Sequence, residues 1–232
     1  MTLLLHGVVR AGHSAALRVV TWRDLAVVVS EWHTPSQQEA LAHLAMLSEL
    51  VLAGPVVPLK YGTTAVDEEA VRAEVLASSA PRLRAHLDRL DGLVELHAYL
   101  RFDEDVALRG VFDEHGSSWR GPGGLDLSTR IRLGEQVAQR IVDWRRARAD
   151  ALLAPVSAAA RDEAHLPDRD HTAERRAFLL PHGEVEPART AIATLAHVAG
   201  VEAECVGPLP AYSFLNETKE TVNTPASSRW GW

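Results

Sequence analysis

The sequence is poor in cysteine: Cys205 is the only one among 232 residues. A single thiol excludes an intrachain disulfide framework and any metal site built from several cysteine ligands. Such a composition is typical of proteins in a reducing compartment. We therefore expect a cytoplasmic protein.

Long apolar runs and an excess of positive charge are also missing. The apolar runs fall well short of the roughly 18–20 residues that span a bilayer, and residues 1–7 lack the basic segment that opens a signal peptide. The formal net charge is −7, which gives no general attraction to a phosphate backbone. The sequence thus predicts no membrane partner and no nucleic-acid partner.

Aromatic residues make up only 6% of the chain, although hydrophobic residues together make up 47%. That total is typical of a globular protein, so aliphatic residues and alanine must fill most of the core. The length of 232 residues allows one large domain or two small ones.

The N-terminal part alternates between strand and helix patterns. Residues 3–10 form an apolar run typical of a strand, and residues 17–20 and 25–29 read as a hairpin. Thr34, Pro35 and Gln37 predict a helix start, and acidic residues from Asp67 predict a second one. The first helix carries one apolar stripe, which we expect to be buried: Leu41, Leu44, Ala45, Val51 and Leu52.

The C-terminal part begins with the clearest strand, residues 94–102, in which apolar and polar residues alternate. Ser128 predicts the start of a long helix with an apolar face that includes Ile131, Val137, Ile141 and Trp144. Residues 177–180, 184–199 and 201–206 follow a strand–helix–strand pattern, and residues 216–232 form a polar tail. The mixture of helices and hairpins indicates the α+β class.

Several groups could carry chemistry, but each has a simpler structural interpretation. His165, Asp168, Asp170 and His171 offer metal donors at a spacing that matches no ligand motif. The glycine-rich residues 121–124 lack the order of a phosphate-binding loop. Asp103, Glu104 and Asp105 suit a helix start, and Cys205 lies on the apolar face of its strand. We expect no enzyme, no cofactor and no metal.

Two segments combine proline, glycine and aromatic residues in an order that no local rule requires: Val57-Pro58-Leu59-Lys60-Tyr61-Gly62-Thr63-Thr64 and Gly207-Pro208-Leu209-Pro210-Ala211-Tyr212-Ser213-Phe214. Two further segments lie between them in the chain, Gly92-Leu93-Val94-Glu95-Leu96 and Ala177-Phe178-Leu179-Leu180. The four segments, in the order in which they occur along the chain, resemble those of the gas vesicle protein F/L family. The chain departs from the family pattern at four positions, where Leu209, Ala211, Tyr61 and Lys60 replace tryptophan, proline, phenylalanine and arginine.

The resemblance implies a two-domain α+β protein. Its parts would be an N-terminal domain over residues 1–91, a modified ferredoxin-like domain over residues 92–214, and a flexible tail over residues 215–232. It also implies a non-enzymatic assembly role, through contact with the small hydrophobic shell protein and other accessory proteins of the vesicle. The alternative is a small-molecule-sensing or regulatory ferredoxin-like module.

The closing segment supplies the candidate protein-binding residues, which are Pro208, Pro210, Tyr212 and Phe214. If the segment is extended, the rings of Tyr212 and Phe214 point to the same side. They could latch the segment onto the protein's own body, or they could anchor a partner. The sequence favours the latch, because aromatic residues beside prolines are often buried by their own domain.

Overall fold

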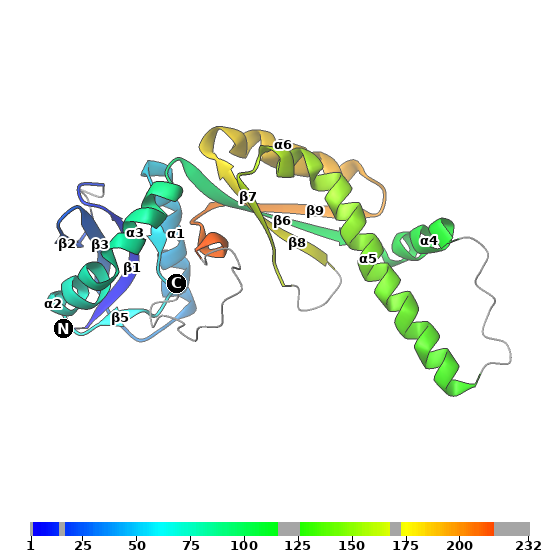
Figure 1. Ribbon diagram of the computed structural model, residues 1–232, viewed down its shortest axis with the longest axis horizontal. Coiled ribbons are helices and arrows are strands. Elements are labelled where there is room, and N and C mark those ends of the chain that lie inside the picture. Colours follow the sequence, from blue (N-terminus) through cyan, green and yellow to red (C-terminus); the bar gives the residue numbers. More distant parts are fainter. Residues whose placement is uncertain (1, 14–16, 116–125, 168–172, 216–232) are drawn as a thin grey trace. The chain divides into compact units, whose positions relative to one another are not determined.

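The computed structural model describes residues 2–13, 17–115, 126–167 and 173–215 (Figure 1). Helices are mixed with two sheets, which confirms the α+β class. The chain forms two compact units: residues within 1–96, 179–185 and 206–232 make the first, and residues 97–178 and 186–205 make the second. The predicted domain boundaries and the ferredoxin-like detail stay predictions, and the predicted tail beyond residue 215 lies outside the described residues.

The first sheet has the strand order β2-β3-β1-β4, and β5 also pairs with β1. These strands are β1 (Leu3–Arg10), β2 (Val19–Trp22), β3 (Leu25–Glu31), β4 (Val57–Pro58) and β5 (Thr64–Ala65). The predicted N-terminal strand and hairpin are confirmed. Leu3 to Val9 are all buried, so both faces of β1 are covered.

Helix α1 (Gln37–Ala53) packs on this sheet with a different face from the predicted one. Its buried residues are His43, Leu47, Leu50 and Val51, whereas Leu41, Leu44, Ala45 and Leu52 are exposed. Gly7 explains the choice, because a Cβ atom there would lie 2.9 Å from Leu47 Cδ2. The missing side chain on β1 makes room for Leu47, which fixes the rotation of the helix. The predicted stripe is therefore wrong except at Val51.

The predicted cap of α1 is also wrong. Ser36, and not Thr34, is the N-cap residue, and its hydroxyl accepts a hydrogen bond from the Glu39 backbone N–H at 3.1 Å.

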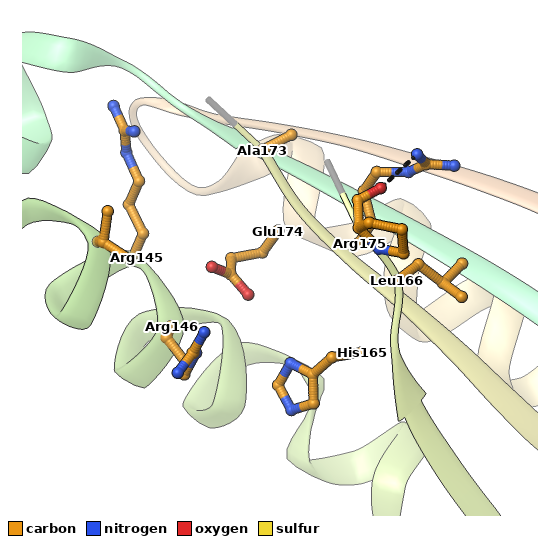
Figure 2. A pocket seen from close by; sticks show the side chains of 9 residues that line it. Arg145, Arg146, His165, Leu166, Ala173, Glu174 and Arg175 are labelled. Carbon is orange, nitrogen blue, oxygen red and sulfur yellow. Dashed lines mark hydrogen bonds between the residues drawn. The ribbon is translucent and has the colours of Figure 1, made fainter. Parts of the chain in front are cut away.

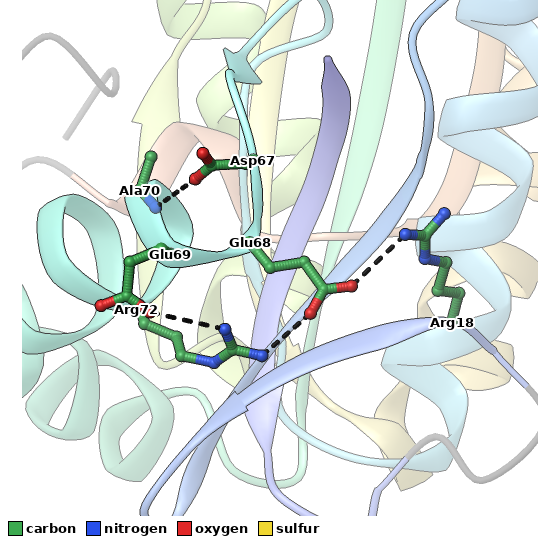
Figure 3. A network of polar contacts seen from close by, with 6 residues as sticks. All are labelled: Arg18, Asp67, Glu68, Glu69, Ala70 and Arg72. Atoms are coloured by element: carbon green, nitrogen blue, oxygen red, sulfur yellow. Dashed lines mark hydrogen bonds and ion pairs between the residues drawn. The ribbon is translucent and has the colours of Figure 1, made fainter. Parts of the chain in front are cut away.

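The next helical region runs through α2 (Glu68–Ala70), a π-helical turn (Val71–Ala77) and α3 (Ser78–Arg89). Asp67 accepts a hydrogen bond from the Ala70 N–H at 2.8 Å, so the acidic start is confirmed. Glu68 pairs with Arg72 at 2.9 Å and with Arg18, next to β2, at 3.3 Å (Figure 3). This pairing connects the helix start to the hairpin.

The second sheet has the order β7-β8-β6-β9. Its strands are β6 (Leu93–Phe102), β7 (Asp162–His165), β8 (Ala173–Pro181) and β9 (Val201–Leu209), and helix α6 (Val185–Thr194) lies between β8 and β9 in the chain. The sequence predicts β6, β8, α6 and β9, but it does not predict β7. Strand β7 escapes prediction because Asp162-Glu163-Ala164-His165 has no apolar alternation.

One buried cation explains why a polar strand lies here. The Arg176 side chain on β8 is only 3% exposed, and it pairs with Glu163 of β7 at 2.6 Å and with Asp150 at 2.5 Å. A buried guanidinium requires such partners, because an unpaired charge in the interior is strongly destabilising.

Helices α4 (Glu104–His115) and α5 (Leu127–Ala159) belong to the second unit. Asp126 caps α5 by accepting from the Thr129 N–H at 2.9 Å, so the predicted cap at Ser128 is wrong. The buried residues of α5 are Ala149, Leu153 and Val156, all toward its C-terminal end. The predicted apolar face is not a buried one, and Ile131 in particular is 54% exposed.

Candidate functional site

The closing segment, residues 207–214, does not stay extended to its end. Strand β9 ends at Leu209, and a 3-10 turn, η5 (Tyr212–Phe214), follows. The two rings therefore have different environments: Phe214 is 4% exposed, whereas Tyr212 is 37% exposed. Pro210 is buried and Pro208 is half-buried. The condition for both rings to point to the same side, an extended backbone, is therefore not met.

Polar contacts fasten the turn to the first unit. The Ser213 N–H and hydroxyl donate to the Glu95 carboxylate of β6 at 2.9 and 2.6 Å, and the Arg89 guanidinium donates to the Phe214 carbonyl. Glu95 itself is only 1% exposed. These contacts agree with the internal latch that the sequence favours.

Gly207 lets the chain enter this latch. Its φ of 143° is a conformation that side chains rarely adopt, and a Cβ atom there would lie 2.9 Å from Leu96 Cδ1. Only glycine accommodates both the turn and the close approach to β6.

A chain of hydrogen bonds joins Tyr212 to the interior of the first unit. His43 Nε2 lies 3.2 Å from the Leu59 carbonyl and 3.0 Å from the Tyr212 hydroxyl, which also donates to that carbonyl. A carbonyl only accepts, so this nitrogen carries the proton. His43 Nδ1 then accepts from His6 Nδ1–H at 2.9 Å, and His6 Nε2 accepts from the Ser30 hydroxyl at 2.9 Å. The contacts thus assign one neutral tautomer to each ring.

Burial keeps both rings neutral. His6 and His43 are each 3% exposed. Desolvation, with a smaller contribution from a charge on His43, lowers the pKa of His6 to about 4, and desolvation also lowers the pKa of His43. Burial raises the pKa of Tyr212, with Glu95 adding to the effect. The hydrogen-bonded side chains therefore keep the same protons near neutral pH, and their role is structural.

The exposed residues of α1 form a second feature, the leucine face, consisting of Leu41, Leu44, Ala45 and Leu52. Leu41 is 61%, Leu44 37% and Leu52 60% exposed. These positions recur with helical spacing and form one stripe beside the buried face. The charged residues of α1 are Glu39 and Glu49, so the stripe has no basic flank. A helix with two apolar faces is suited to binding an apolar partner.

The other candidates from the sequence have structural roles or lie elsewhere. Asp103 caps α4 through the Val106 N–H at 3.1 Å, and Glu104 and Asp105 lie in the first turn. His165 is exposed at the end of β7. Burial raises the pKa of the half-buried Cys205 thiol, which disfavours a reactive thiolate. Asp168, Asp170, His171 and the glycine-rich residues 121–124 lie outside the described residues.

Within the part of the chain that the structure describes, no group of three or more histidine, cysteine and acidic side chains is arranged to hold a metal ion. In the same ranges, no helix combines the length and apolarity needed to cross a membrane.

Sequence reasoning did not identify Glu95, His6 and Ser30 as parts of this site. Strict alternation places Glu95 on the solvent side of its strand, and nothing local shows that Ser213 will cover it. The only signal for His6 is a titratable residue within an apolar strand run, which is expensive to bury without a partner.

Comparison with known proteins gives a consistent result. Residues 5–216 match the family model described as gas vesicle synthesis protein GvpL/GvpF. The chain is 25% identical to gas vesicle protein F of Streptomyces sp. (strain CB03234), in an alignment that covers 93% of this chain and all of that protein. It is 26% identical to gas vesicle protein L2 of Halobacterium salinarum (strain ATCC 700922 / JCM 11081 / NRC-1), over 69% of this chain and 64% of that protein.

Solved structures show the same fold. The crystal structure of GvpF from Microcystis aeruginosa matches with a TM-score of 0.74 at 12% identity, covering 93% of this chain and 99% of that one. The crystal structure of GvpF from Anabaena sp. PCC7120 matches with a TM-score of 0.76 at 15% identity, covering 96% and 99%.

Proposed function

The chain belongs to the gas vesicle synthesis protein GvpL/GvpF family, and from this premise we propose that it is a non-enzymatic accessory protein that binds the small hydrophobic shell protein during vesicle assembly. Family membership supports a role in gas vesicle assembly. The choice of the hydrophobic shell protein as the partner rests on the exposed leucine face of α1. Other accessory proteins of the vesicle are further proposed partners.

The mechanism is capture of an unassembled shell subunit. A small hydrophobic subunit exposes apolar surface, which drives aggregation until the shell covers it. The leucine face of α1 covers part of that surface by burying Leu41, Leu44 and Leu52 against it. Complete burial of one leucine is worth about 1.5–3 kcal/mol, so a stripe of this size supports a weak contact that releases the subunit to the growing shell.

The closing segment has a supporting place in this mechanism. Tyr212 is 37% exposed and bonds to His43 of α1, so we propose that it contributes to the contact surface. Pro208, Pro210 and Phe214 act through the latch that holds Tyr212.

A gene cluster that carries one copy of this gene tests the proposal. Deletion of the gene should abolish or deform the vesicles, measured as pressure-sensitive light scattering of whole cells. Complementation with the wild-type gene should restore them, whereas the double variant Leu41→Ser/Leu52→Ser should not, at equal protein level. Val66→Ser, which removes an apolar side chain that is 70% exposed and lies outside α1, is the matched control. Normal vesicles after deletion would refute the proposed role.

A further inference from the structure

The long helix α5, in the other unit of the chain, carries a second apolar surface that the described residues leave exposed. Between Leu127 and Arg148 this helix has no buried residue, although 22 of its 33 residues lie there. Packing of an amphipathic face is the usual source of helix stability, so a helix of this length with so little burial has an apolar face available for a partner.

That face continues the part of α5 that is already buried. Leu127, Ile131, Ala138 and Val142 fall within an arc of about 80° that also contains the buried Ala149, Leu153 and Val156. Leu127 is 71% and Ile131 is 54% exposed. We call these four residues the α5 strip.

Helix α4 does not cover the strip. The ring of Trp144 lies beside Gly110 of α4, where a Cβ atom would be 2.4 Å from the indole, and its centroid lies 5.7 Å from that of Phe102. Trp144 projects roughly 100° or more around the helix axis from the strip. The contact with α4 therefore uses a different side of α5.

The strip ends in a basic pocket. Val142 belongs both to the strip and to the lining of a cavity of about 450 Å³, which Arg145, Arg146, His165 and Arg175 also line. Figure 2 shows Glu174 of β8 and His165 of β7 pointing into the space beside the two arginines of α5. Three arginines against one glutamate leave this pocket with a net charge of +2.

The charge of the helix agrees with that of the pocket. Helix α5 has six arginines and three acidic residues, a net charge of +3, in a chain whose net charge is −7. On the helical projection the edges of the strip carry Arg145, Arg146 and one acidic residue, Glu135. An apolar strip with this net positive border is complementary to an apolar helix with acidic flanks.

We propose that the α5 strip and its pocket bind an acidic amphipathic helix of a partner protein, with a carboxylate of that helix entering the pocket. A flat lipid surface would cover the strip but could not fill a concave cavity. The inference goes beyond the proposed function, because it concerns a different unit and a partner of different chemistry.

Two synthetic peptides of about 18 residues test the proposal, because a helix of that length is stable enough to serve as a probe. Both peptides have the same leucine face; one has glutamate flanks and the other lysine flanks. Fluorescence anisotropy with the full chain should give a dissociation constant about tenfold lower for the glutamate peptide, and that difference should shrink at high salt.

Variants locate the site. Ile131→Ser and Arg146→Glu should each weaken binding of the glutamate peptide about five- to tenfold, with an unchanged circular dichroism spectrum. Leu41→Ser on α1 should leave the affinity for the glutamate peptide unchanged, although the same variant should impair capture of the shell protein. The two proposals can therefore fail separately.

Three results would overturn the inference. They are equal affinity for both peptides, no binding of the glutamate peptide at millimolar concentration, and binding that ignores both α5 variants. Binding of the chain to lipid vesicles that contain phosphatidylserine would also overturn the inference if Ile131→Ser abolished that binding, because the α5 strip would then be a membrane-binding surface.

Discussion

At the scale of single residues, the interior of the first unit depends on two histidines that stay neutral. The two Nδ1 atoms of His6 and His43 lie 2.9 Å apart, with one proton between them. A proton added at His43 Nδ1 would place two hydrogens in that gap and one positive charge on the buried pair. The Tyr212 hydroxyl bonds to the other end of this chain at His43. The latch of the closing segment is therefore sensitive to the protonation of a buried pair.

We predict that the free energy of unfolding falls as the pH is lowered from 6.5 toward 4. The pKa of His6 is near 6.5 in the unfolded chain and about 4 in the folded one. The unfolded state thus binds more protons in this window, and stability rises with pH. The loss across the window is on the order of 3 kcal/mol. Urea unfolding at several pH values measures it.

The variant His6→Gln should make this pH dependence shallower, although it lowers stability at every pH. The exposed His182 supplies the control, and His182→Gln should leave the slope as in the wild type. An identical slope in His6→Gln and the wild type would mean that another group causes the pH dependence.

Only part of this site could be predicted from the residues themselves. The sequence singled out the closing segment and favoured the latch, because proline beside aromatic residues restricts the chain and needs burial. It could not show that Tyr212 would reach His43, since 169 residues separate them. Pairings of that separation depend on the whole fold, and no periodicity reports them.

At the scale of elements, the period of the hydrophobic pattern predicted whether a segment is a strand or a helix. It did not predict which face of helix α1 is buried. Strands β1, β3 and β6 were predicted because each has a β-branched or alternating run bounded by turn residues. Helix α1 is apolar on two adjacent faces, so its sequence fits either rotation. The contact of Leu47 with Gly7 decides between them.

We predict different effects of leucine truncation on the two faces of α1. Leu47 is fully buried, and Leu47→Ala should lower the free energy of unfolding by about 2–5 kcal/mol. Leu52 is 60% exposed, and Leu52→Ala should change it by no more than about 0.5 kcal/mol. Denaturant midpoints of the two variants measure this. A large loss in Leu52→Ala would show that the leucine face is covered within the chain.

Two helical glycines give a paired prediction for the second unit. Alanine normally stabilises a helix over glycine by about 1 kcal/mol. At Gly134 of α5 nothing lies within 4 Å of a new Cβ atom, so Gly134→Ala should be stabilising. At Gly110 of α4 the new atom would lie 2.4 Å from the Trp144 ring, so Gly110→Ala should be destabilising. Thermal melts followed by tryptophan fluorescence compare them, and stabilisation by both would contradict the packing of α4 on Trp144.

At the scale of the whole molecule, the ordered motifs carried more information than composition did. Bulk numbers indicated only a globular protein, whereas four segments in the correct order indicated the family, and the match over residues 5–216 confirms it. The sequence did not show that an expected core stripe of α1 would be the exposed one. The proposed capture of the shell protein rests on that exposure, which only the three-dimensional structure reveals.

Capture by the leucine face can be measured by co-purification with the major shell protein in a host that lacks the other vesicle genes. We expect specific recovery of the shell protein with the wild-type chain, and strongly reduced recovery with Leu41→Ser/Leu52→Ser. Recovery should also fall for Tyr212→Ala and should be unchanged for Ile131→Ser. Equal recovery with the wild-type chain and the α1 double variant would refute the proposed capture, because the leucine face would then have no part in binding the shell protein.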